Sequence, residues 1–137
     1  LMEMGVIPVV NENDTVAVDE LEGPSFGDND TLSAIVTELT GADLLVILTD
    51  IDGLYDSDPR KDPQAKRIPY VKTITPDIEA LAGGAGSARG TGGMITKIRA
   101  AQRVNAHGVP CCIVSGSDPE ILYELLAGRQ VGTTFGV

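Results

Sequence analysis

The segment GTGGMITK, residues 90–97, combines three glycines with a lysine and leads into a run that has the pattern of a helix. Glycines let backbone N–H groups approach an anion closely, a helix N-terminus adds partial positive charge, and Lys97 adds a full charge. Together these features indicate a phosphate site. The segment is not a Walker A loop, because that motif has glycine directly before its lysine and Thr96 stands there. On this segment alone, a surface loop with a solvated lysine is the alternative, and Arg89 is favoured as a surface charge.

A second group of polar residues, GDND at 27–30, lies where a helix is expected to begin. Capping the free N–H groups of a helix needs one carboxylate or amide, so this cluster leaves at least one side chain for a ligand or for orienting a lysine. Capping alone is the alternative. The cluster NEND at 11–14, taken by itself, is more typical of a polar turn.

The acid-rich stretches also suggest calcium, but their spacing excludes an EF-hand loop. That loop has glycine at its sixth position, which is Ser33 when counted from Asp28 and Tyr55 when counted from Asp50. The segment DIDGLYDSDPR, residues 50–60, is either a solvated loop or a cover over a nucleotide with Tyr55 as a packing surface. His107 is the only histidine, so sites built on His and Cys and nucleophiles activated by His have little support within this chain.

Four apolar runs predict strands. VIPVV at 6–10 is expected to be a buried strand, and LLVILT at 44–49 a strand covered on both faces of a parallel sheet. CCIVS at 111–115 and VGTTF at 131–135 complete the set, and TVAV at 15–18 is a further short candidate.

The helices are predicted from periodicity and capping residues. The first follows residue 30, with an apolar face and a stop at Gly41; the face comprises Leu32, Ile35, Val36 and Leu39. A short helix has Thr75 as N-cap and Pro76 at its first position, and a longer one runs from about residue 94 to 107 and stops at Gly108. The last has Asp118 as N-cap and Pro119 at its first position.

The remaining segments are expected to be loops: 19–30, 83–93, and an excursion over 50–69 that could hold a small hairpin. Because strands and helices alternate, the predicted class is an α/β sandwich with a mainly parallel sheet and right-handed crossovers. In such sheets, ligands bind at the carboxyl ends of the strands. The polar clusters after residues 10 and 48, and those that open the helices near 30 and 94, occupy such positions.

Composition limits the class of partner. The chain has 137 residues with 20 acidic and 10 basic side chains, a net charge of −10, which argues against DNA, RNA and anionic membranes. With 42% hydrophobic and 22% charged residues it is expected to be one folded domain or part of one. Cys111 and Cys112 are adjacent in a predicted strand and cannot pair. Without a disulfide framework, a leader or a membrane-length apolar run, the expected location is the cytoplasm.

The opening LMEMG has the pattern of the last turn of a helix that closes on Gly5, so the chain is expected to start within a longer protein. A processed terminus is the alternative.

Taken together, five segments in this order and spacing resemble the amino acid kinase family, in particular its members that phosphorylate glutamate. The segments are IPVVNENDTVAV, GDNDTLSAIV, ADLLVILTDIDGLYDSDPR, GTGGMITKIRAA and VGTTF. The resemblance implies a three-layer α/β sandwich around a mainly parallel sheet. It implies that residues 1–137 are the C-terminal, nucleotide-binding portion of the kinase domain, with the N-terminal half absent.

The resemblance also implies an activity: transfer of the γ-phosphoryl group of ATP, accompanied by Mg²⁺, to the side-chain carboxylate of L-glutamate, the first step of proline synthesis. It implies that Asn11, Asp14 and Asn29 hold the amino acid and that Asp30 organises the catalytic lysines. The nucleotide would be held by Thr49 and Asp50 and, at its phosphates, by Thr91, Gly92, Gly93, Met94, Ile95, Thr96 and Lys97. Lys97 would stabilise charge on the transferred group. Proline as a feedback inhibitor and a homo-oligomeric state are further implications.

The chain departs from the family pattern at its front. The opening strand, a glycine-rich loop with a second catalytic lysine, and a serine contact to glutamate have no counterpart here, so residues 1–137 alone are expected to be inactive. The loop at 19–27 is longer than the family pattern. Two alternatives stay open: a related kinase for a nucleotide monophosphate or another carboxylate, which need not keep both NEND and GDND, and a non-catalytic nucleotide-sensing module, which would need no lysine at position 97.

Overall fold

The computed structural model describes residues 1–11, 29–83 and 93–136. In chain order, its elements are the 3₁₀ helix η1 (Met2–Met4), α1 (Asn29–Thr40), β1 (Leu45–Thr49), β2 (Tyr70–Val71), α2 (Pro76–Leu81), α3 (Gly93–Asn105), β3 (Cys111–Ser115), α4 (Ile121–Leu126) and β4 (Thr133–Phe135).

The four strands form one sheet in the order β1-β3-β4-β2. β1 runs parallel to β3 over its whole length, from Leu45 opposite Cys111 to Thr49 opposite Ser115. β2 is parallel to β4, whereas β3 and β4 are antiparallel, with Cys111 opposite Phe135. Two of the three pairings are parallel, which confirms the predicted α/β class with a mainly parallel sheet.

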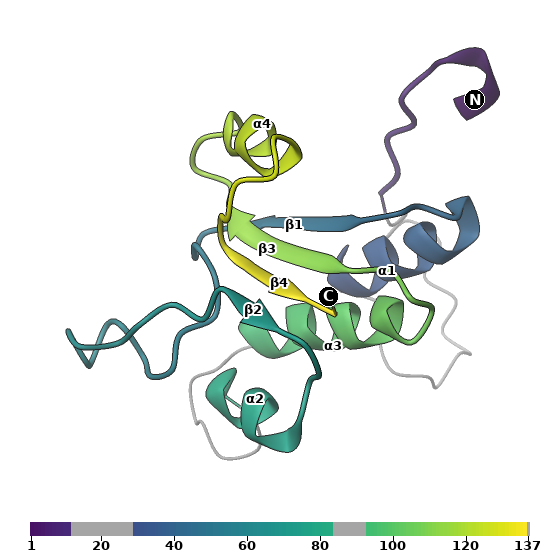
Figure 1. The fold of residues 1–137 in the computed structure, drawn as a ribbon. Helices are drawn as coiled ribbons and strands as arrows, with labels where there is room; N and C mark the ends of the chain where they lie inside the picture. Colours follow the sequence, from purple (N-terminus) through teal and green to yellow (C-terminus); the bar gives the residue numbers. More distant parts are fainter. Residues whose placement is uncertain (12–28, 84–92, 137) are drawn as a thin grey trace.

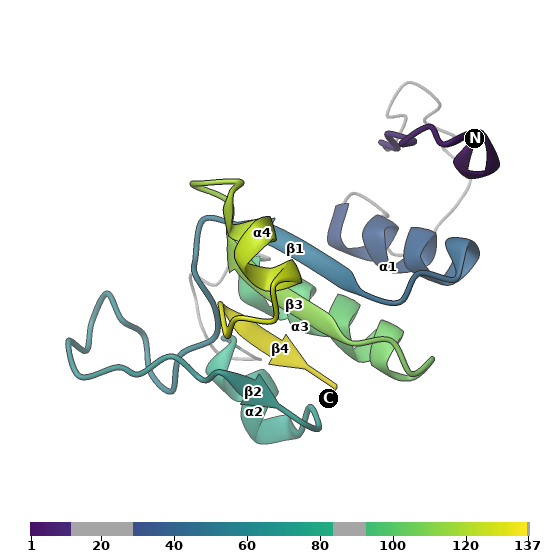
Figure 2. The same ribbon diagram turned by 45° about the horizontal axis from the view of Figure 1, so that its top comes forward.

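The helices lie on both sides of this sheet. Helices α1, α2 and α3 are on one side and α4 is on the other, near the carboxyl ends of β1 and β3 (Figures 1 and 2). The arrangement has three layers, as expected. The carboxyl ends of β1 and β3 lie together, so the loops that follow them meet at one edge of the sheet.

The core is built mainly between α3 and the middle of the sheet. Ile98 and Val104 of α3 are fully buried and belong to one apolar cluster with Ile113 of β3 and Phe135 of β4. Burying side chains of this size contributes roughly 1.5–3 kcal/mol each to the free energy of folding. After α3 the chain turns at Gly108, whose φ of +76° is left-handed, so the predicted stop is confirmed.

α1 does not bury the face that its apolar residues predicted. Ala34 and Thr37 are its buried residues, whereas Leu39 is 81% exposed. The reason is that α1 packs against α3, and small side chains allow two helices to approach closely. The buried Thr37 hydroxyl is satisfied because it donates to the Ser33 carbonyl oxygen at 2.8 Å.

The N-terminal segment also differs from its prediction. Residues 6–10 form no strand, and Ile7 and Val9 are 87% and 95% exposed. A strand needs a neighbouring strand for its backbone hydrogen bonds, and no strand in the described ranges pairs with this segment, which runs outside the sheet (Figure 1). The helical turn before it is confirmed, because Gly5 has a φ of +70° and its N–H donates to the Met2 carbonyl oxygen.

β1 is covered well on one face only. Leu45 and Ile47 are buried on the side of α1 and α3, whereas Leu48, on the opposite face, is 45% exposed. On that side, the helix that the structure describes is α4, which has six residues. The prediction of full cover on both faces is therefore wrong.

The predicted start is confirmed for one of the two short helices and wrong for the other. α2 begins at Pro76 with Thr75 as its N-cap, as predicted. α4 begins at Ile121 with Glu120 as its N-cap, so the predicted start at Asp118 is wrong. The Asp118 side chain instead accepts a hydrogen bond from the Glu120 N–H at 3.0 Å, which closes a turn ahead of the helix.

Several expectations lie outside the described residues: the strand at 15–18, the loop over 19–28, residues 84–92 of the glycine-rich stretch, and the site residues Asp14, Thr91 and Gly92. Cys111 and Cys112 are both free and buried, as expected. No helix within the described ranges is long and apolar enough to cross a membrane.

Candidate functional site

The site is centred on an ion pair near the N-termini of α1 and α3. Lys97 Nζ lies 3.0 Å from Asp30 Oδ2, and the two side chains are 16% and 13% exposed. The Thr96 hydroxyl lies 2.8 Å from the same carboxylate oxygen. Because α1 packs along α3, the start of each helix is fixed beside the other. Two residues from distant predicted clusters are thus brought together.

The first turn of α3 also presents backbone groups near this pair. Gly93, Met94 and Ile95 form the start of the helix, and their N–H groups belong to the set that an α-helix leaves without intrahelical partners. The Thr96 hydroxyl also lies 2.9 Å from the Gly93 carbonyl oxygen, to which it can donate. Partial positive charge at this terminus and the Lys97 ammonium together favour an anion.

Thr49 and Asp50 lie at the carboxyl end of β1, as predicted. The Thr49 hydroxyl donates to Asp50 Oδ1 at 3.1 Å, and the Thr49 carbonyl oxygen accepts from the Gly116 N–H at 2.7 Å. The second bond fixes the chain after β3 beside the chain after β1. Ser115 is therefore held opposite Thr49, the residue before Asp50, at the edge where both strands end.

A cavity of about 710 Å³ joins this edge to the start of α3. Its lining includes Asp50, Ser115 and Met94, together with residues 51–55 and 57–61 from the excursion and 80–83 from the end of α2. The lining is mixed: Ile51, Leu54 and Leu81 are apolar, whereas the acidic and basic side chains lie on the excursion. A volume of this size accommodates a ligand as large as a nucleotide.

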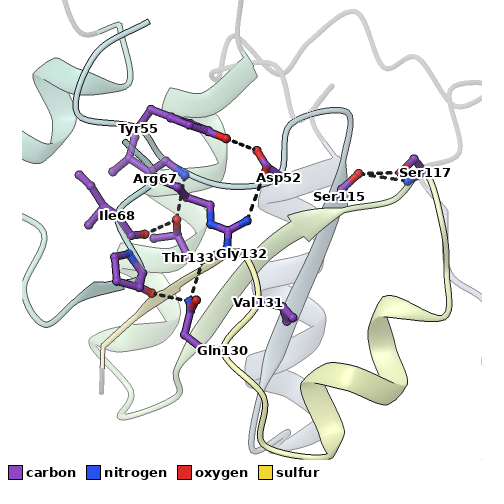
Figure 3. A network of polar contacts seen from close by, with 12 residues as sticks. Asp52, Tyr55, Arg67, Ile68, Ser115, Ser117, Gln130, Val131, Gly132 and Thr133 are labelled. Atoms are coloured by element: carbon purple, nitrogen blue, oxygen red, sulfur yellow. Dashed lines mark hydrogen bonds and ion pairs between the residues drawn. The ribbon is translucent and has the colours of Figure 1, made fainter. Parts of the chain in front are cut away.

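The wall of this cavity contains a polar network that the sequence did not predict (Figure 3). Arg67 Nη1 lies 3.0 Å from Asp52 Oδ2, and the Tyr55 hydroxyl donates to Asp52 Oδ1 at 2.8 Å. The hydrogen bond to Asp52 raises the pKa of Tyr55 above its usual value, and partial burial adds to the shift. Tyr55 is therefore a neutral donor at physiological pH.

A buried threonine ties the same segment to the sheet. The Thr133 hydroxyl of β4 accepts from the Leu54 N–H at 2.8 Å and donates to the Ile68 carbonyl oxygen at 2.6 Å (Figure 3). Tyr55 and Arg67 form an antiparallel bridge just beyond it. The small hairpin expected within 50–69 is thus confirmed, and its base is fastened to β4.

Two predicted substrate residues meet at a different place. Asn11 and Asn29 both line a cavity of about 460 Å³ between residues 8–11 and α1, with Ser33 beside them. Asn29 directly precedes Asp30, so this cavity adjoins the ion pair. The third predicted residue of the group, Asp14, lies outside the described residues.

A metal site built from protein side chains alone needs several ligating side chains that converge on one point. Across residues 1–11, 29–83 and 93–136, no three His, Cys, Asp or Glu side chains converge as metal ligands.

The sequence matches the amino acid kinase family over residues 1–115. The chain belongs to this family. This assignment agrees with the α/β fold, in which the parallel strands β1 and β3 end beside the start of α3.

Among its curated relatives, the glutamate 5-kinase of Geobacter metallireducens is 58% identical over 135 residues, 98% of this chain and 35% of the relative. The glutamate 5-kinase of Clostridium perfringens is 53% identical over 136 residues, 98% of this chain and 51% of the relative. The chain thus spans about a third to a half of the length of these relatives.

Solved structures of the amino acid kinase fold are similar in architecture. UMP kinase from Bacillus anthracis has a TM-score of 0.59 at 18% identity, covering 80% of this chain and 41% of that protein. A T. acidophilum isopentenyl phosphate kinase has a TM-score of 0.58 at 22% identity, covering 79% of this chain and 39% of that protein. At these identities the likeness supports the fold alone.

Proposed function

We propose that the full-length protein transfers the γ-phosphoryl group of ATP to the side-chain carboxylate of L-glutamate, which yields glutamyl 5-phosphate and ADP. The observation that carries this proposal is the 53–58% identity to glutamate 5-kinases over 98% of the chain. The structures of UMP kinase and isopentenyl phosphate kinase are far more distant in sequence, at 18–22% identity. Glutamate is therefore favoured over a nucleotide monophosphate.

The chemistry requires positioning and charge neutralisation more than acid–base catalysis. A glutamate side chain has an ordinary pKa near 4.3, so at neutral pH its carboxylate is already the nucleophile and needs no general base. A carboxylate oxygen attacks the γ-phosphorus, the bond from that phosphorus to the β–γ bridging oxygen breaks, and ADP leaves with the electron pair. Negative charge on the transferred group is what a side chain must neutralise.

Lys97 is the residue proposed for that task. Its ammonium group is held at 3.0 Å by Asp30, which limits its rotamers before substrate binds. A preorganised cation stabilises developing charge without the cost of reorienting solvent. Asp30 acts through Lys97, so we assign it the role of organising this lysine, together with the other catalytic lysine that the family pattern contains.

The nucleotide is proposed to occupy the cavity that Asp50 and Met94 line, with its phosphates directed at the start of α3. Thr49 and Asp50 would contact it at the end of β1, and Gly93 to Thr96 would face its phosphates. Thr91 and Gly92 complete this proposed set. Mg²⁺ is proposed to arrive with ATP and to neutralise charge between its phosphates.

The amino acid is proposed to bind Asn11 and Asn29, which line one cavity beside the ion pair, and Asp14. Proline resembles a cyclised glutamate without the side-chain carboxylate. It can use the same contacts without offering a group for phosphorylation, which supports feedback inhibition at an overlapping site. We further propose that the chain is the C-terminal, nucleotide-binding portion of its kinase domain and that the full-length protein is a cytoplasmic homo-oligomer.

A substrate comparison tests the proposal. The full-length protein is assayed for ADP release with Mg²⁺ and ATP in the presence of L-glutamate, L-aspartate, UMP or isopentenyl phosphate. The expected result is release that depends on glutamate, with a kcat/KM at least tenfold above that for each other acceptor. Release that depends instead on UMP or isopentenyl phosphate would contradict the proposed function.

A further inference from the structure

We propose that Arg67 is a positioning residue for nucleotide binding: it holds Asp52, and through Asp52 it orients Tyr55 in the wall of the cavity. The inference rests on the proposed function for its ligand, ATP. Asp52 and Tyr55 line the cavity directly, whereas Arg67 reaches Asp52 from the opposite side of the hairpin (Figure 3).

The contacts form a chain that passes from Arg67 to the cavity wall. The Arg67 guanidinium donates to Asp52 Oδ2 at 3.0 Å, and the other oxygen of that carboxylate, Oδ1, accepts from the Tyr55 hydroxyl at 2.8 Å. Asp52 therefore has both of its oxygens engaged, one on each side. This arrangement holds the side chain of Tyr55 at its hydroxyl end.

The stem of Arg67 supports the same turn by packing. A side chain at Gly53 would place its Cβ 2.9 Å from Arg67 Cδ and 2.6 Å from the Thr133 hydroxyl oxygen, so the backbone of the turn lies directly against both residues. Gly53 also has a φ of +151°, which other residues rarely adopt. The turn that carries Asp52 thus packs closely against the Arg67 side chain.

The two supports of the hairpin have different consequences. Thr133 is fully buried and fastens the backbone at Leu54 and Ile68, which makes it a determinant of stability. The Arg67 and Asp52 side chains are 34% and 47% exposed, and ion pairs at such positions contribute little to the free energy of unfolding. The effect of Arg67 is therefore expected in ligand binding rather than in folding.

The test is Arg67→Gln in the full-length protein, with ATP as the probe. By isothermal titration calorimetry we expect the Kd for ATP to rise roughly 1.5- to 5-fold, the range set by a partly exposed ion pair. KM for ATP should rise in parallel, with kcat, KM for glutamate and the unfolding midpoint unchanged. Arg67→Lys, which keeps the stem and the charge, should restore part of the affinity. Arg129→Gln, which breaks a surface ion pair with Glu124, is the matched control and should leave ATP binding unchanged.

A double-mutant cycle decides whether Arg67 acts through Asp52. In the Asp52→Asn background, Arg67→Gln should cause no further loss of ATP affinity. The inference is overturned if Arg67→Gln binds ATP like the wild type, if its effect adds fully to that of Asp52→Asn, or if the loss is matched by an equal fall in glutamate affinity and unfolding midpoint. A wild-type protein that binds ATP but does not phosphorylate glutamate would overturn the proposed function, while the same binding comparison would still decide the role of Arg67.

Discussion

Lys97 Nζ and Asp30 Oδ2 lie 3.0 Å apart although 67 residues separate them in the sequence. Both side chains are mostly buried; Asp30 is in the first turn of α1, and Lys97 lies one turn inside α3. The contact places a cation beside two helix N-termini, where an anion is also favoured. The proposed phosphoryl transfer depends on this contact, and it can be probed from both of its ends.

Replacing Lys97 removes the charge proposed to stabilise the transferred group. In the full-length protein, Lys97→Ala should lower kcat by roughly 10²–10³-fold, with a much smaller change in KM for glutamate. Lys97→Arg should rescue activity only in part, because a planar guanidinium replaces a compact ammonium. Lys72→Ala, at an exposed lysine next to β2, is the control and should retain wild-type kcat. Steady-state kinetics in which KM rises and kcat is unchanged would mean that Lys97 acts in binding and does not stabilise the transferred group.

Replacing Asp30 tests the organising role. Asp30→Asn keeps the size of the side chain but removes the charge that holds the Lys97 ammonium, so kcat should fall although Lys97 itself is not replaced. Loss of a charge-assisted contact costs about 1.5–3 kcal/mol, which corresponds to roughly 10- to 150-fold. Lys97→Ala and Asp30→Asn combined should lose less than the product of the two single losses, because part of the Asp30 effect passes through Lys97. Fully additive losses would mean that Asp30 acts independently of Lys97.

The sequence was informative where a pattern is local. The helix predicted from about residue 94 to the stop at Gly108 is found as α3, and Gly108 has the left-handed φ expected of such a stop. β3 is a continuous apolar run, and it is buried. The side chains expected at the carboxyl end of β1, Thr49 and Asp50, are also found at the edge of the sheet where a ligand would bind.

The sequence was uninformative where a contact depends on tertiary structure. The bond between Leu54 and Thr133 joins residues 79 apart, and nothing in the local spacing of either residue signals it. The same holds for Asp52 and Arg67, 15 residues apart across a hairpin. The prediction of a strand over residues 6–10 was wrong for a related reason: an apolar run becomes a strand only where a neighbouring strand supplies its hydrogen bonds.

The buried hydroxyl of Thr133 should matter for stability. Thr133→Val keeps the shape but leaves the Leu54 N–H and the Ile68 carbonyl oxygen without this partner, so the free energy of unfolding should fall by about 1–3 kcal/mol. Thr134→Val is the matched control, because the Thr134 hydroxyl donates only to the Cys112 sulfur at 3.6 Å, and it should have a smaller effect. Guanidinium unfolding curves measure both. Equal effects would mean that the bridge from β4 to the hairpin adds no stability.

The pair between α1 and α3 at Glu38 and Arg103 should make stability depend on pH. Arg103 donates to both oxygens of Glu38, at 2.6 and 2.9 Å, and this bonding holds the pKa of Glu38 below its usual value, with a further contribution from His107. A lowered pKa stabilises the folded state above the unfolded pKa, near 4.3 for glutamate, and that stabilisation is lost as the pH falls through the lower folded value.

The comparison of wild type with Arg103→Gln measures this effect. The difference in unfolding midpoint should be constant between pH 7 and about 5 and should shrink as the pH falls below about 4.3. In the Glu38→Gln background, the effect of Arg103→Gln should not vary over the same range. If the difference in unfolding midpoint instead grew as the pH fell below about 4.3, the prediction would be contradicted.

The most direct measurement is the identity of the phosphorylated product. The full-length protein is incubated with ATP, Mg²⁺, L-glutamate and hydroxylamine, which converts an acyl phosphate to a hydroxamate that mass spectrometry identifies. We expect one γ-glutamyl hydroxamate for each ADP released, dependent on both glutamate and ATP and nearly abolished by Lys97→Ala. ADP release without the hydroxamate, or a hydroxamate on the α-carboxylate, would contradict transfer of the phosphoryl group to the glutamate side chain.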